Sequence, residues 1–199
     1  MPGNASPLFE RLKTSEIGDR RWWRAVKSLA RKGPCVIPAL IGALESENIH
    51  LRQGAAKALQ LIGSPTVPFW IKALKHPNVN VRRKAAIGIY ANAFHAQKAI
   101  PALFETLSDS DTEVREMSVV ALELLAFLFG PIVSPAIPRL VGLLANDDDY
   151  VVRSWAARAL GSIGPEAISS LSDLKDAAND VDDEVREAAA EAIQRISQK

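Results

Sequence analysis

The feature that most constrains the fold is an internal repeat with a period of 30 to 38 residues. The repeat is anchored on five arginines, each preceded by an aliphatic residue: Arg52, Arg82, Arg115, Arg153 and Arg186. Successive arginines lie 30, 33, 38 and 33 positions apart. Periods of this length are typical of arrays in which each repeat is a small structural unit that buries its apolar face against its neighbours. The sequence therefore predicts a chain of stacked repeats.

Further positions align around each arginine and predict a helix there. Four residues before the arginine stands an Asn or Asp, the residue types that begin helices: Asn48, Asn78, Asp111, Asp149 and Asp182. Small or β-branched residues follow three and four positions after it, as at Ala85 and Ala86. Seven positions after it comes a large aliphatic residue: Leu59, Ile89, Leu122, Leu160 and Ile193. This spacing gives the helix one apolar face, on which small residues let a neighbouring helix approach closely.

A shorter helix is predicted before each of these. Its apolar residues recur at i, i+3, i+4 and i+7, as in Ile100, Leu103, Phe104 and Leu107. In four repeats a proline falls within the first turn, where its missing N–H costs no hydrogen bond: Pro38, Pro68, Pro101 and Pro138. Glycines are predicted to end the second helices: Gly33, Gly63, Gly130 and Gly164. Each repeat is therefore expected to be a pair of helices.

The arginine column needs its own explanation, because a cation near a helix N-terminus opposes the helix dipole. An arginine that reaches an acidic or amide side chain in the turn of the neighbouring repeat would offset this cost. Such a contact would also fix the register of adjacent repeats. We therefore interpret the five arginines as a structural ladder and not as a ligand site.

The first-helix pattern Ile-Pro-x-Leu and the second-helix pattern Val-Arg-x-x-Ala-Ala-x-x-Leu resemble HEAT repeats. More narrowly, they resemble the short bacterial type found in phycobilisome-lyase-like proteins. The resemblance covers residues 35–199 in five repeats, after a degenerate unit that has Trp22 in the arginine column. It implies an all-α fold, a right-handed α-α superhelix (α-solenoid) of about five to six HEAT-like helix pairs.

We expect residues 1–199 to form a single HEAT-repeat solenoid. A degenerate N-terminal cap repeat spans 1–34, with its first helix near Pro7 to Lys13. The repeats that follow span 35–63, 64–96, 97–130 and 131–164, and a C-terminal capping repeat spans 165–199. In this last repeat Lys175 and Ala178 replace large aliphatic residues, as is typical of a repeat whose outer face meets solvent.

The composition of the chain indicates the cellular compartment in which the protein is expected. The single cysteine, Cys35, excludes an internal disulfide and a cysteine-based zinc site, which fits a reducing compartment. The longest nearly uncharged apolar stretch, residues 119–129, is shorter than the roughly 20 residues that a membrane span needs. Residues 1–13 lack the layout of a signal peptide. We therefore expect a cytoplasmic protein that does not enter a membrane.

Charge is distributed unevenly along the chain. Residues 1–100 contain 16 Lys and Arg against 5 Asp and Glu, whereas residues 101–199 contain 8 against 18. Such asymmetry indicates an acidic partner for the first half, or head-to-tail self-association of the chain. Surface composition without a single partner explains it equally well.

Residue types that carry catalysis are sparse. His50, His76 and His95 lack the spacing of a metal site, and none is followed by Glu as in HEAT-like di-iron hydroxylases. Cys35 follows Pro34 at the start of a first helix, where the helix dipole would favour a thiolate, but packing is the simpler role. We therefore predict no catalytic residue, no metal and no cofactor.

The second helices offer a candidate binding surface. Positions one, five and eight after the arginine point away from the apolar side and are predicted to line the concave face of the solenoid. The candidate partner-binding residues there are Trp23, Lys27, Gln53, Lys57, Arg83, Tyr90, Glu116 and Arg158. Because Trp, Tyr and Arg commonly anchor interfaces, the chain is predicted to be a non-catalytic scaffold that binds an extended or acidic protein partner.

Two other functions stay open. The basic residues of 1–100, together with Trp22 and Trp23, resemble the DNA-binding groove of HEAT-like alkylpurine DNA glycosylases. However, Asp19 is the one Asp in those residues, and binding through the DNA backbone needs several phosphate contacts. The repeat subtype also implies an accessory subunit of a bilin-lyase-like complex, although no Cys, His or Asp cluster supports a pigment site.

Overall fold

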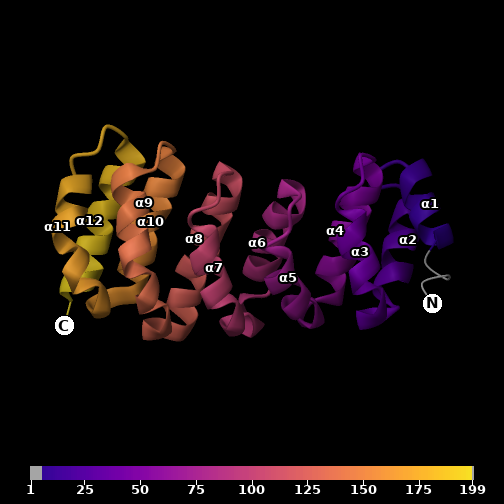
Figure 1. Ribbon diagram of the computed structural model, residues 1–199, viewed down its shortest axis with the longest axis horizontal. Helices are drawn as coiled ribbons and strands as arrows, with labels where there is room; N and C mark the ends of the chain where they lie inside the picture. The colour runs from indigo at the N-terminus through magenta and orange to yellow at the C-terminus, as the bar shows by residue number, and fades with distance from the viewer. Residues whose placement is uncertain (1–5, 199) are drawn as a thin grey trace. The chain divides into compact units, whose positions relative to one another are not determined.

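The computed structural model describes residues 6–198, and every regular element in this range is helical (Figure 1). Contacts group the chain into two compact units, Met1–Asn92 and Ala93–Lys199, called here the first unit and the second unit. The α-helices of the first unit are α1 (Ser6–Thr14), α2 (Arg20–Ala30), α3 (Ile37–Ala43), α4 (Ile49–Ile62), α5 (Val67–Ala73) and α6 (Val79–Ala91). Those of the second unit are α7 (Ile100–Thr106), α8 (Thr112–Phe129), α9 (Ile137–Asn146), α10 (Tyr150–Ile163), α11 (Leu171–Ala177) and α12 (Asp183–Ser197).

Within each unit the helices form pairs of a first and a second helix (Figure 1). Each second helix packs against its own first helix and against the second helix of the adjacent pair. In the first unit α4 contacts α2, α3 and α6, and in the second unit α10 contacts α8, α9 and α12. Such contacts bury a continuous core between neighbouring pairs, which is how stacked repeats gain stability.

The second helices begin at the Asn or Asp that the sequence marks. Its side chain accepts a hydrogen bond from a backbone N–H of the first turn, as Asn48 does from Leu51 at 3.0 Å and Asp149 from Val151 at 2.8 Å. The same cap stands at Asp19, Asn78, Asp111 and Asp182. Because this oxygen satisfies an N–H that has no partner within the helix, the cap defines where each second helix starts.

The ends of the second helices differ between repeats. Helices α4, α8 and α10 end at Gly63, Gly130 and Gly164, whose φ angles of 75°, 62° and 79° favour glycine. Helix α2 ends before Gly33, which begins a short 3₁₀ turn. Helix α6 ends instead at Asn92 with φ of −118°, and two short 3₁₀ turns follow before α7. The boundary between the two units falls at this end.

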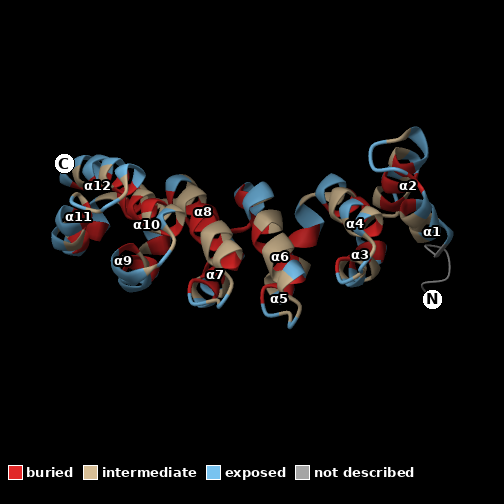
Figure 2. Cartoon of the chain, turned by 90° about the horizontal axis from the view of Figure 1, so that it is seen from above, coloured by how far each residue is buried: buried red, intermediate tan, exposed pale blue. Residues whose placement is uncertain are grey.

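The core lies between the helices of a pair and between adjacent second helices (Figure 2). Most first helices insert a fully buried leucine from the same repeat position: Leu40, Leu103, Leu140 and Leu174. The facing second helices present buried alanines: Ala58, Ala121, Ala159 and Ala192. Each of these repeats thus buries a large residue on its first helix and a small residue on its second helix at constant positions.

The arginine column contacts the turn before its own helix. In all five repeats Nη1 of the arginine donates to the carbonyl oxygen six residues earlier, at 2.6 to 3.1 Å. We call this residue the turn position: Ser46, His76, Asp109, Asp147 and Asp180. Its side chain in turn accepts the backbone N–H of the Asn or Asp that caps the helix. The arginine and the turn position therefore hold each turn together.

In the second unit two of these arginines also bind the turn position of the next repeat. Arg115 donates from Nε and Nη2 to Asp147 at 2.7 and 2.9 Å. Arg153 binds Asp180 in the same bidentate manner, with both distances 2.9 Å. Bidentate pairs of this kind are geometrically specific, so they fix the register of adjacent repeats. Arg186, in the last repeat, pairs with Asp183 on its own helix.

These ion pairs shift the pKa values of their partners. Burial raises the pKa of Asp147, but the hydrogen bonds from Arg115 and from the N–H of Asp149 outweigh it, so the pKa lies below its ordinary value. For Asp180 the hydrogen bond from Arg153 is the largest cause, and it lowers the pKa against the effect of burial. Both aspartates are therefore stabilised in their charged form by the fold.

Residues 112–146 are the one described stretch whose length and hydropathy suit a membrane span, with a mean hydropathy of 2.0 over the best window. The stretch comprises α8, a 3₁₀ segment over Gly130–Ala136 and α9, and 44% of that window is buried. Val119, Leu122 and Leu125 of α8 are completely buried among the helices of the second unit. Helix α8 thus has the packing of a core helix in a repeat.

Candidate functional site

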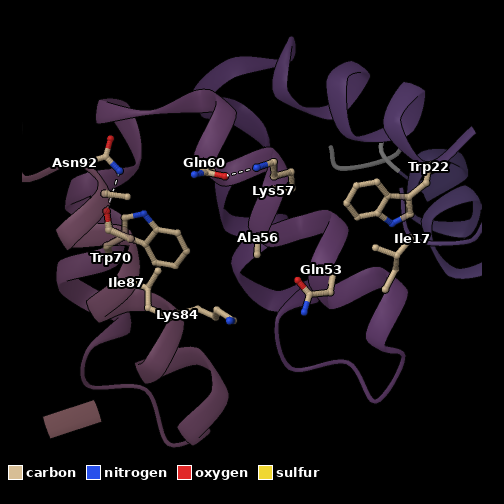
Figure 3. A pocket seen from close by; sticks show the side chains of 12 residues that line it. Ile17, Trp22, Gln53, Ala56, Lys57, Gln60, Trp70, Lys84, Ile87 and Asn92 are labelled. Carbon is tan, nitrogen blue, oxygen red and sulfur yellow. Dashed lines mark hydrogen bonds between the residues drawn. The ribbon is translucent and has the colours of Figure 1, made fainter. Parts of the chain in front are cut away.

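A cavity of about 300 Å³ opens on the first unit between α4 and α6 (Figure 3). Helices α2 and α5 and the loop before α2 complete its walls. The larger apolar side chains of its lining are Ile17, Trp22, Trp70 and Ile87. The polar side chains are Gln53, Lys57, Gln60, Lys84 and Asn92. The cavity therefore combines apolar walls with amide and ammonium groups.

An exchange of residue size between α5 and α6 builds one wall. Trp70 stands where the other first helices carry the buried leucine, and Gly88 stands where the other second helices carry the buried alanine. A Cβ atom on Gly88 would lie 2.4 Å from Cε2 of Trp70, so the indole occupies the space that a side chain would need. Trp70 is 3% exposed, and its ring borders the cavity. This repeat thus has Trp and Gly where the other repeats have Leu and Ala, and the indole forms an aromatic wall.

Trp22 and Ile17 line the cavity at the other end from Trp70 (Figure 3). The indole Nε1 of Trp22 donates to the carbonyl oxygen of His50 at 3.1 Å, which ties α2 to the start of α4. No described residue accepts a hydrogen bond from the indole Nε1 of Trp70. Trp22 is therefore held by a hydrogen bond, whereas the Trp70 ring is held by packing against Gly88.

Two lysines give the cavity a positive charge. The ammonium group of Lys57 donates to Oε1 of Gln60 at 2.8 Å, which leaves two of its three N–H donors for a ligand. Lys84 is half-buried on α6, and no described carboxylate pairs with it. The sequence contains no Asp or Glu between Glu47 and Glu105. The electrostatic potential at the cavity therefore favours an anionic ligand.

A basic and aromatic surface on α2 adjoins the cavity. Trp23 borders a shallow hollow together with Arg20, Arg24 and Lys27. Its ring packs edge-on against Trp22, with 5.2 Å between centroids and an interplanar angle of 86°. The Lys57 ammonium lies 5.8 Å from the centroid of the Trp23 ring, within the range of a cation–π interaction. Lys57 therefore links the surface of α2 to the mouth of the cavity.

Four of the predicted surface residues come together in this region: Trp23, Lys27, Gln53 and Lys57. Arg83 and Tyr90 lie on α6 in the same unit but do not border the cavity. Tyr90 is 42% exposed, so it is accessible on that helix. The candidate surface in the first unit is therefore centred on α2 and α4, and α6 adds Ile87, which is at position five, and Lys84, which was not predicted.

The last two predicted surface residues, Glu116 and Arg158, belong to the second unit. The guanidinium of Arg158 lies 5.5 Å from the ring centroid of Trp155, on the same helix. Burial raises the pKa of Glu116, and the charges of Asp149 and Glu113 raise it further. The surroundings of Glu116 are thus more acidic than those of the cavity in the first unit.

The structure adds residues that the helical positions alone did not select. Trp70 and Lys84 line the cavity although they lie outside positions one, five and eight, and Ile17 comes from a loop. A signal for the site was present in the sequence, because Trp70 and Gly88 each break an otherwise constant column of the repeat. A large residue in one column and glycine in the facing column indicate a local change of packing.

Groups that could carry other chemistry lie apart from the cavity. Cys35 is exposed, and its Sγ contacts the carbonyl oxygen of Lys32 at 3.1 Å. Among residues 6–198 there is no group of three or more His, Cys, Asp or Glu side chains that could hold a metal ion. The lining of the cavity itself offers apolar contact, positive charge and hydrogen-bonding groups.

The sequence profile of HEAT repeats matches residues 67–127 and 123–194, which together make up more than half of the chain. The chain belongs to the HEAT-repeat family. This confirms the family predicted from the arginine, proline and alanine positions. No curated protein matches the sequence significantly.

Solved structures of helical repeat proteins share the fold. An engineered protein superposes with a TM-score of 0.64 at 24% identity, covering 97% of this chain and 96% of its own. A designed armadillo repeat protein in complex with the peptide (KR)4 has a TM-score of 0.65 at 18% identity, covering 96% and 98%. The complex of CpcE and CpcF of phycocyanin lyase from Nostoc sp. PCC7120 has a TM-score of 0.56 at 21% identity, covering 79% and 98%. These similarities confirm the predicted class, an all-α solenoid of helix pairs.

Proposed function

We propose that this HEAT-repeat protein is a non-catalytic scaffold that binds an extended, acidic segment of a protein partner. The binding surface is formed by α2, α4 and α6 of the first unit and includes Trp23, Lys27 and Lys57. One observation carries the proposal: lysines, arginines and tryptophans meet on this surface while the sequence lacks carboxylates from residue 48 to residue 104. A flexible acidic segment is the ligand that such a surface attracts and can bury.

The related structures support a peptide or protein as the ligand. A designed armadillo repeat protein of similar fold is in complex with the basic peptide (KR)4, and CpcE is in complex with CpcF. Extended repeats present long surfaces on which a segment without structure of its own can lie. Because the surface in the first unit is basic here, the complementary segment carries the opposite charge to (KR)4.

A nucleic acid is the second candidate, since cations and tryptophans together also bind bases and phosphates. The first unit has 15 Lys and Arg against 5 Asp and Glu, which favours any polyanion. Single-stranded nucleic acid would bind with strong salt dependence through several phosphate contacts along a continuous groove. The cavity between α4 and α6 has two lysines and three amide side chains, a composition better matched to a peptide backbone with carboxylates.

The test measures binding of dye-labelled probes by fluorescence polarisation. The probes are a peptide of alternating Asp and Glu, the peptide (KR)4 and a single-stranded oligonucleotide. Lys57→Glu with Lys84→Glu reverses charge at two residues that line the cavity, and Arg31→Glu with Lys72→Glu makes the same change at exposed positions outside it. We expect the acidic peptide to bind the native chain and to lose at least about tenfold in affinity with the first pair of substitutions.

The control pair should retain binding within about twofold, and circular dichroism should show unchanged helix content for both. Preference for the oligonucleotide over the acidic peptide at physiological salt would replace the scaffold function by nucleic-acid binding. Equal binding of the acidic peptide and (KR)4 would show that charge does not select the ligand, which would refute the proposal.

A further inference from the structure

We propose that the cavity between Trp70 and Trp22 is an anchor pocket for one aromatic side chain flanked by carboxylates. This inference rests on the proposed function and adds a sequence requirement to the acidic segment. The segment would place a Phe, Tyr or Trp in the cavity, and its neighbouring Asp or Glu side chains would meet Lys57 and Lys84.

The size of the cavity favours a single side chain. Its volume of about 300 Å³ lies at the lower end of the range for ligand cavities, which suits one large residue better than a whole cofactor. Trp70, Ile87 and Trp22 provide apolar contact on several sides. Aromatic rings gain more from such walls than aliphatic chains do, because ring pairs add an electrostatic preference to the buried area.

The construction of the wall argues that the cavity is a specific feature of one repeat. In the repeat of residues 64–96, Trp70 and Gly88 stand at two positions where the other four repeats of residues 35–199 have a buried leucine and a buried alanine. The indole lies where a side chain on Gly88 would lie, so both exchanges are needed together. Packing alone does not require this exchange, since buried Leu and Ala fill the same two positions in the other four repeats.

Polar groups at the rim select the flanking residues. Lys57 and Lys84 come from two different helices, α4 and α6, so they lie on either side of the space between these helices (Figure 3). Gln53 and Gln60 on α4 carry both donors and acceptors, which match the N–H and C=O groups of an extended peptide. Residues 48–104, which supply α4, α5 and α6 of the lining, contain no Asp or Glu, and this disfavours a basic segment in the same place.

The test compares two peptides that differ in one side chain. The probes are Glu-Asp-Glu-Phe-Glu-Asp-Glu and the same peptide with Ala in place of Phe, each labelled at the N-terminus. We expect the Phe peptide to bind the native chain at least about tenfold more tightly than the Ala peptide, because a buried aromatic ring replaces water in the cavity.

The decisive variant is Trp70→Leu with Gly88→Ala, which places at these positions the residues that the other four repeats have and is therefore expected to fold. In this variant the Phe peptide should lose its advantage, so that the two peptides bind within about twofold of each other. Lys84→Met should weaken both peptides and preserve their ratio, whereas Lys72→Met, at an exposed position outside the cavity, should change neither. Thermal melting followed by circular dichroism checks that each variant is folded.

The outcomes separate the two proposals. If both acidic peptides bind the native chain equally, the anchor pocket is refuted while the scaffold function stands. If the Phe peptide keeps its advantage in the Trp70→Leu, Gly88→Ala variant, the ring binds elsewhere and the assignment to this cavity is wrong. If neither acidic peptide binds the folded native chain, both proposals fail.

Discussion

The two units share one architecture for their turns but differ in the charge at the turn position. In the second unit this residue is Asp109, Asp147 or Asp180, and Asp147 and Asp180 each bind both their own helix cap and the arginine of the preceding repeat. In the first unit it is Ser46 or His76, which accept the same bond from the helix cap. Ser46 and His76 carry no carboxylate with which to bind an arginine of the preceding repeat.

This difference shows that the charged side chains of the two units have different roles. The local role of the turn position needs only a hydrogen-bond acceptor, so Ser, His and Asp all serve it. The contact between repeats needs a carboxylate, and it occurs where acidic residues are abundant. The first unit lacks these carboxylates, so its lysines and arginines dominate the surface that we propose for binding. The carboxylates of the second unit fix the register of its repeats, and the first unit has an excess of positive charge.

The largest expected effect comes from removing an arginine that connects two repeats. Arg115→Ala deletes the bidentate bond to Asp147, whose side chain is 3% exposed, and leaves a buried carboxylate without its partner. We expect a loss of about 3 kcal/mol in the free energy of unfolding, measured by urea denaturation and circular dichroism. Arg52→Ala removes bonds to the carbonyls of its own turn, and we expect a loss of about 1 kcal/mol.

The ratio of these two effects is the result that matters. Hydrogen exchange of backbone amides assigns each loss to a unit, because α8 and α10 should lose protection with Arg115→Ala while α4 should not. Equal losses for the two substitutions would show that the contact between repeats contributes nothing beyond the contact within the turn.

A second prediction concerns acid. The pKa values of Asp147 and Asp180 lie below 3.8 in the folded chain, so their contribution to stability is fully present above the ordinary pKa. It is lost as the pH falls through the folded values, which places the loss below about pH 4. Hydrogen exchange at α8, α10 and α12, corrected for the intrinsic rate, should therefore show a drop in protection in this window.

Asp147→Asn with Asp180→Asn provides the matched control. Asparagine keeps an acceptor for the helix cap but removes the charge, so we expect about 1.5 kcal/mol less stability at pH 7 for each substitution. The doubly substituted chain should lose less of its remaining stability on acidification than the native chain does. An unchanged acid response would mean that other carboxylates cause it.

The sequence alone predicted the helix pairs because their signals are local and recur. An Asn or Asp cap, a proline in the first turn and the spacing of apolar residues each act within a few residues, so five imperfect copies reinforce one another. The end of α6 was not predictable in this way, since Asn92 replaces the glycine that ends α4, α8 and α10. No repeated position marks the boundary between the two units.

The candidate site was less predictable, because a cavity depends on which side chains are missing as well as on those present. Helix geometry selected Gln53 and Lys57, which do line it. It could not select Trp70, which lies on a first helix and reaches the cavity only because Gly88 has no side chain. Ile17 comes from a loop whose path is set by the packing of α1 and α2 and not by a repeat pattern.

The smallest expected effect comes from a substitution that gives the first unit a carboxylate at its turn position, as in the second unit. His76→Asp places a carboxylate at the turn position that follows Arg52, as Asp147 follows Arg115. The native His76 lies 3.5 Å from Glu45, so the new carboxylate also meets a like charge there. We expect a net gain of about 0.5 kcal/mol in the free energy of unfolding, measured by urea denaturation at low ionic strength, and this gain should become smaller as salt is added.

The variant His76→Asn separates the effect of charge from the loss of the His–Glu contact, and Arg52→Met should abolish the gain. If His76→Asp does not exceed His76→Asn in stability, a carboxylate at the turn position is not sufficient to connect two repeats, and the backbone geometry of the second unit must also be required.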